Sequence, residues 1–90
     1  MESILITITR QEIFSDDVVF RIFEIMSASG MQWLVQKQHG HNTKGAGMGW
    51  IETERRFATQ SNAITYWENA ISLHGITLRL KTPSTMKVTS

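Results

Sequence analysis

The 90-residue chain contains no cysteine, a single proline and no long apolar run. Without cysteine it has no disulfide, no thiolate zinc site and no thiol nucleophile. Pro83 lies near the C-terminus, so proline interrupts no earlier helix or strand. No segment approaches the roughly 20 apolar residues of a membrane-spanning helix, and the N-terminal residues lack the basic and apolar regions of a secretion signal. We therefore expect a cytoplasmic protein that does not enter a membrane.

Charge is also scarce, because 19% of the residues are charged and the formal net charge is +1. This composition excludes a disordered tail and a general polycation. The charge is uneven: residues 1–30 hold five acidic and two basic residues, whereas residues 31–90 hold three acidic and seven basic residues. The apolar fraction of 41% is sufficient for one hydrophobic core. We expect a single domain over residues 1–82 and a flexible tail over residues 83–90.

The first half of the chain predicts a strand, a helix and a second strand. Residues 4–9 alternate between isoleucine and other side chains, which is typical of a strand with one apolar face. A helix is predicted over about residues 16–28, with Ser15 as its N-cap and Gly30 just past its end. The apolar residues at helical spacing in this segment are Val19, Ile22, Phe23 and Met26. Alternation predicts the second strand over residues 31–39.

The second half of the chain predicts a hairpin, a helix and a last strand. Residues 40–49 hold four of the six glycines and are predicted to connect to a strand over about residues 48–57. Thr59 is a candidate cap for a second helix that ends at His74 and Gly75. Residues 76–81 alternate between aliphatic and polar side chains. The resulting order, β-α-β-β-α-β, predicts an α+β ferredoxin-like fold with a four-stranded antiparallel sheet and both helices on one face.

The sequence carries no catalytic motif, and we expect a non-enzymatic protein without cofactor or metal. It has no GxSxG nucleophile elbow and no phosphate-binding glycine pattern. A large aromatic on an open sheet face often marks a partner surface, and Trp50 is predicted to lie on the face away from the helices. The candidate partner-binding residues are Trp50, Met48, Lys44, His39, His41 and Arg55. Exposed edge strands also predict a homodimer, formed by edge pairing or face packing.

These features favour a small interaction or regulatory protein that binds another protein. Short chains of this kind are common among accessory regulators and among phage or mobile-element inhibitors of host machinery.

Two alternative functions remain open. Basic residues on the sheet predict a nucleic-acid-binding module, in which Trp50 stacks on bases; the candidate residues are Lys37, Arg56, Arg79 and Lys81. The pair His39 and His41, together with Tyr66 on a helix, resembles nucleases of the His-hydrophobic-His class, although Gly40 replaces the bulky apolar residue between the histidines. This resemblance implies a metal-dependent nuclease.

Overall fold

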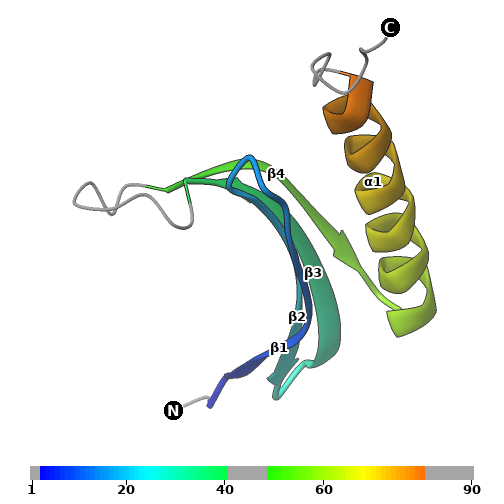
Figure 1. Cartoon of the computed structure of the whole chain (residues 1–90). Coiled ribbons are helices and arrows are strands. Elements are labelled where there is room, and N and C mark those ends of the chain that lie inside the picture. The colour runs from blue at the N-terminus through cyan, green and yellow to red at the C-terminus, as the bar shows by residue number, and fades with distance from the viewer. Residues whose placement is uncertain (1–2, 41–48, 81–90) are drawn as a thin grey trace, which may run out of the picture.

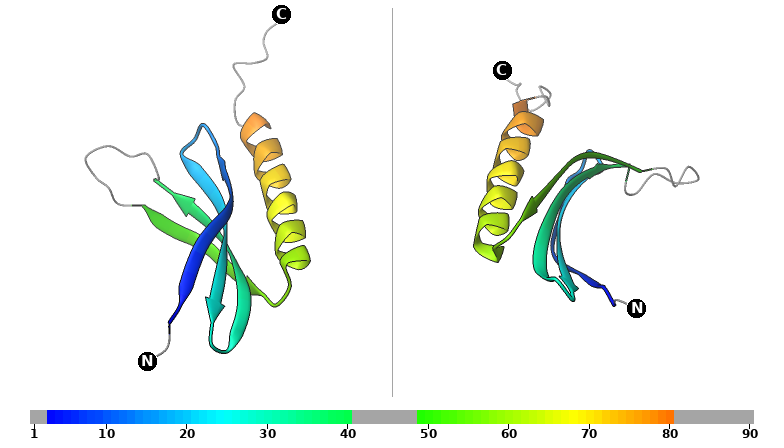
Figure 2. Two further views of the ribbon diagram at one scale, coloured as in Figure 1. Left: turned by 90° about the horizontal axis from the view of Figure 1, so that it is seen from below. Right: turned by 180° about the vertical axis from the view of Figure 1, so that it is seen from behind.

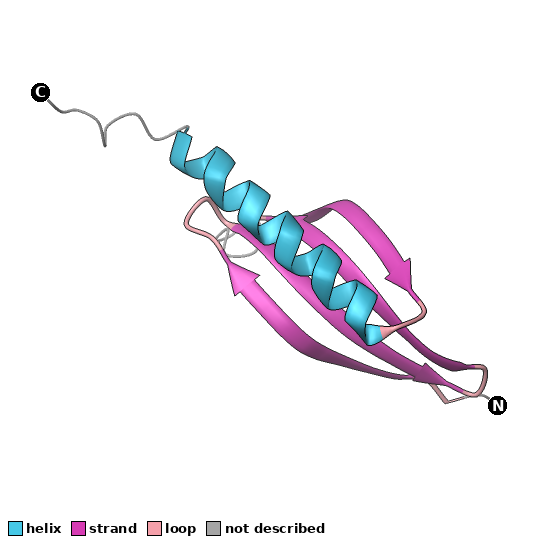
Figure 3. Ribbon diagram, turned by 90° about the vertical axis from the view of Figure 1, so that its right-hand side faces the viewer, coloured by secondary structure: helices cyan, strands magenta, loops and turns pink. Residues whose placement is uncertain are grey.

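The computed structural model describes residues 3–40 and 49–80, which form a four-stranded sheet and one helix (Figure 1). The strands are β1 (Leu5–Ile13), β2 (Val18–Ser27), β3 (Gly30–His39) and β4 (Trp50–Phe57), and the helix is α1 (Gln60–Leu80). Each strand pairs antiparallel with the next, in the order β1-β2-β3-β4. Helix α1 crosses one face of the sheet diagonally, and its last turns project past the strands (Figures 1 and 3).

The predicted ferredoxin-like fold is wrong, because the described chain is β-β-β-β-α and residues 16–28 contain a strand instead of a helix. Asp16 and Asp17 belong to the turn between β1 and β2, where Asp17 has a φ of 67° and the Phe14 carbonyl accepts from its backbone amide at 3.0 Å. Both faces of β2 carry apolar side chains. A strand that carries apolar side chains on both faces has them at nearly every position, so helical spacing can be found within it.

The last predicted strand is also wrong, since the described residues 76–80 complete α1. Gly75 lies inside this helix, and a single glycine weakens a helix without ending it. The start of α1 is as predicted: the Thr59 hydroxyl accepts from the backbone amide of Asn62 at 3.3 Å, which is the N-cap interaction. The strand predicted over residues 31–39 is confirmed as β3, and the strand predicted over 48–57 is confirmed as β4 from Trp50 onward.

The sheet is strongly curved, and its convex face packs against α1 while its concave face points away from the helix (Figures 1 and 2). Directly paired residues in antiparallel strands lie on the same face. Ile22 pairs with Val35 on the convex face, whereas Phe23 pairs with Leu34 on the concave face.

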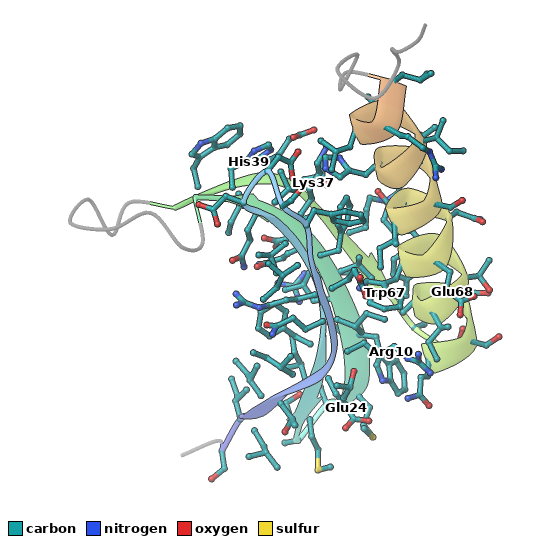
Figure 4. All side chains as sticks on the ribbon, viewed as in Figure 1. Arg10, Glu24, Lys37, His39, Trp67 and Glu68 are labelled. Carbon is teal, nitrogen blue, oxygen red and sulfur yellow. The ribbon has the colours of Figure 1, made fainter. Side chains whose placement is uncertain are left out.

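The core lies between the convex face and the first half of α1. It consists of Val18, Phe20, Ile22, Val35, Ala63 and Trp67. Trp67 points from α1 into the sheet (Figure 4), and its indole Nε1 donates to the Phe20 carbonyl at 3.1 Å. Further along the helix, the His74 ring packs edge-on against the rings of Phe14 and Phe20, and His74 hydrogen-bonds Asp16 at 3.0 Å. These contacts fix α1 across β2 and leave its outer side free of the sheet.

Candidate functional site

A polar cluster lies on the convex face at the end of β3 and the start of β4. The His39 imidazole stacks on the Trp50 indole, with ring centroids 4.1 Å apart and planes inclined by 5°. Glu52 accepts from Lys37 at 3.2 Å and lies 2.5 Å from His39 Nε2. Lys37 and His39 are on the same side of the sheet as α1 (Figure 4). The cluster therefore combines a stacked ring pair with one carboxylate shared by two basic side chains.

A β-bulge explains why Trp50 is not on the predicted face. In the β3–β4 register, Lys37 pairs with Thr53 but Gln38 pairs with Ile51, so Glu52 is the extra residue. Such an insertion reverses the alternation of side chains along the strand. Trp50 and Glu52 consequently share the convex face with α1, whereas Glu54 points to the concave face. The prediction that Trp50 lies on the face away from the helix is wrong for this reason.

The Glu52 carboxyl has a pKa below its ordinary value of 4.5, chiefly because it hydrogen-bonds His39 and secondly because of Lys37, while partial burial opposes the shift. A carboxyl whose pKa is lowered by folding stabilises the folded state at pH values above its ordinary pKa. This stabilisation is lost as the pH falls through the lowered pKa.

The Glu52→Gln variant is expected to be less stable than the wild type at neutral pH. The loss should be less than about 1 kcal/mol, because the Glu52 carboxylate and its basic partners are solvent-accessible. The difference should close as the pH falls below 4.5 and through the lowered pKa, where the Glu52 carboxyl of the wild type also becomes protonated. Urea unfolding midpoints measured over this range test the expectation. Glu54→Gln is the control, since Glu54 contacts the neutral amide of Gln36. A difference that widens on acidification would contradict the assignment.

The other predicted site residues do not gather on one surface. Arg55 lies over the Tyr66 ring on the convex side, with its Cζ 5.2 Å from the centroid, whereas Arg56 is on the concave face. Arg79 is in the last turn of α1. The structure thus brings together His39 and Trp50 from the partner-binding set, and it spreads Lys37, Arg56 and Arg79 over separate surfaces. The remaining predicted residues lie outside the described ranges; they are His41, Lys44, Met48 and Lys81.

Within residues 3–40 and 49–80, no group of three or more histidine, aspartate or glutamate side chains is close enough to hold a metal ion. His39 contacts Trp50 and Glu52, and Tyr66 packs on the Phe57 ring at a centroid distance of 5.4 Å.

An outward apolar stripe on the second half of α1 was missed by the sequence reasoning. It consists of Leu73, Ile76 and Leu80, and Leu73 and Leu80 are the most exposed of the large apolar side chains in the described structure, at 67% and 77%. Their spacing of i, i+3 and i+7 places them on one side of the helix. This signal is present in the sequence, but the assignment of residues 76–81 to a strand hid it.

A groove lies beside this stripe, between α1 and strands β2, β3 and β4. It has a volume of about 260 Å³, and its lining includes Phe20, Lys37, Tyr66, Ala70, Leu73 and His74. Leu73 belongs to both features: it forms one wall of the groove and one end of the outward stripe. A protruding apolar ridge therefore lies beside a recess whose lining combines apolar side chains with polar ones, including Lys37 and Glu52.

Comparison of the chain with protein-family models, curated proteins and solved structures finds no match. Among the residues that the structure describes, no helix is both long enough and apolar enough to span a bilayer.

Proposed function

We propose that this chain is a non-enzymatic interaction protein that works as a homodimer, joined through the outward stripe of α1 and the adjacent groove. The observation that carries this proposal is the juxtaposition of stripe and groove at Leu73. A two-fold interface uses the same patch on both copies, so the patch must be complementary to itself. A ridge next to a recess satisfies that condition, because each stripe can enter the groove of the other copy.

The distribution of apolar side chains supports association. In the described part of the chain, eight apolar residues are buried, whereas twelve large apolar side chains are exposed. Scattered exposed leucines are ordinary, but exposed apolar side chains that share one side of a helix, as the three of the stripe do, are typical of an interaction site. The stripe also holds no charged residue among its three members, in keeping with the depletion of charge at interface centres.

Edge pairing through β1 is less well supported as the route to a dimer. The β1–β2 register is interrupted between Ile8 and Arg10, and such a bulge disturbs the regular edge that a second strand requires. Arg10 and Glu12 also place charges along β1, which is one way in which proteins discourage edge pairing.

Cysteine cross-linking tests the proposed contact, since the chain has no native cysteine and one introduced thiol reports one position. Leu73→Cys is expected to form a disulfide-linked dimer under mild oxidation, because Leu73 lies where the stripe meets the groove. The control is Glu68→Cys: Glu68 is exposed on α1 and points away from the sheet (Figure 4), roughly 140° around the helix from Leu73.

Non-reducing electrophoresis gives the readout. Rapid dimer formation by Leu73→Cys with little by Glu68→Cys supports the interface. Equal rates for both variants would contradict it, because random collisions cross-link any two exposed thiols alike.

A further inference from the structure

The concave face differs in charge from the rest of the described structure. Arg21 and Arg56 stand on it with a single acidic residue, Glu54. The other described residues comprise six acidic and four basic side chains. The six acidic residues lie on the convex face, in the β1–β2 turn or on α1; they are Glu12, Glu24, Glu52, Asp16, Asp17 and Glu68. The concave face is therefore net positive, whereas the remainder is net negative.

A row of hydrogen-bonded polar side chains crosses all four strands on this face. The Arg21 guanidinium donates to Gln11 on β1 at 2.6 Å and to Gln38 on β3 at 2.9 Å. Gln38 in turn donates to Gln36 at 2.6 Å, and Gln36 donates to Glu54 on β4 at 3.2 Å. These bonds hold the arginine and the amides in place before any partner binds. Such preorganisation lowers the entropy cost of binding.

An apolar row lies next to this polar row. The register aligns Ile8, Phe23, Leu34 and Arg56 across the four strands. A shallow hollow of about 170 Å³ opens beside it, lined by Ile6, Phe23, Ile25, Leu34 and Gln36. Arg56 ends the row at β4, where its Nη1 donates to Gln32 at 3.1 Å.

We propose that the concave face binds single-stranded nucleic acid. The two guanidiniums would contact phosphates, and the faces of unpaired bases would pack on the apolar row around Phe23. The glutamine amides offer both donors and acceptors, which match the edges of unpaired bases. Open sheet faces that combine cationic and apolar side chains suit single strands, whose bases are free to splay onto them. The proposed dimer contact is on the opposite side of the sheet, so either proposal can fail alone.

Two neighbouring arginines on β4 allow a matched test. Arg56 is on the concave face and Arg55 is on the convex face, and both are exposed. Binding of a labelled single-stranded oligonucleotide is measured by fluorescence anisotropy at several salt concentrations. Arg56→Gln removes one phosphate contact and should raise Kd roughly fivefold near 0.1 M salt. The slope of log Kd against log salt concentration should also decrease by about 0.7. Arg55→Gln should leave both unchanged, and Arg56→Lys should restore the slope.

We expect Arg56→Gln to weaken oligonucleotide binding and Arg55→Gln to leave it unchanged. The circular dichroism spectra of both variants should match that of the wild type. Three results would overturn the proposal: no binding of the wild type at low salt, equal losses in the two glutamine variants, or displacement of the oligonucleotide by polyglutamate at equal charge concentration. The last of these would identify the face as a site for acidic protein segments.

Discussion

Trp67→Ala is expected to lower the free energy of unfolding by about 3–5 kcal/mol, the usual cost of truncating a buried aromatic side chain to alanine. Trp67 is the largest side chain in the core between α1 and the sheet. The substitution also removes the hydrogen bond from its indole to the Phe20 carbonyl. Because small domains are stable by only about 5–15 kcal/mol, much of the total is lost.

Urea unfolding followed by circular dichroism measures this loss, and Trp50→Ala is the matched control. Trp50 is 56% exposed and stacks on the His39 ring at the sheet end, so its removal should cost far less. Comparable losses at the two positions would mean that α1 does not pack on the convex face through Trp67.

Leu73→Glu is expected to abolish self-association at concentrations where the wild type is dimeric. Truncating a hot-spot residue at the centre of an interface costs about 2 kcal/mol or more, and in a two-fold interface each substitution acts twice. A total of about 4 kcal/mol corresponds to a rise in the dimer Kd of roughly a thousandfold. Burying the new carboxylates would add to this cost. Sedimentation velocity over a series of concentrations measures the shift.

Leu5→Glu is the matched control, since Leu5 is a leucine of similar exposure (60%) on the edge strand β1. It should leave the dimer Kd unchanged. The reverse outcome, with Leu5→Glu monomeric and Leu73→Glu dimeric, would place the interface on the β1 edge instead of on α1.

The local signals that were predicted correctly depend on neighbouring residues alone. The Thr59 cap, the alternation of β3 and the strand character of residues 50–57 are properties of short segments, and the structure confirms all three. The helix predicted over residues 16–28 failed because the apolar residues of β2 serve two faces. Val18, Phe20 and Ile22 enter the core under α1, whereas Val19 and Phe23 face the concave side. Only the tertiary arrangement distinguishes that pattern from a helical stripe.

The candidate sites were harder to predict, because they depend on register. The bulge at Glu52 moves Trp50 to the convex face, and no residue type at this position of the sequence predicts a bulge. Arg21 is not among the predicted binding residues, because its segment is assigned to a helix; its place in the polar row of the concave face becomes visible only when β2 lies between the strands of Gln11 and Gln38. The outward stripe at Leu73 likewise emerges once α1 continues to Leu80.

The most direct test of the proposed dimer is the molar mass of the wild type and of Leu73→Glu by size-exclusion chromatography with light scattering. For a chain of 10.3 kDa, the proposed dimer predicts twice that mass for the wild type and a single chain mass for the variant. A wild type that remains a monomer at high concentration would contradict the central claim, as would a Leu73→Glu variant that keeps the dimer mass.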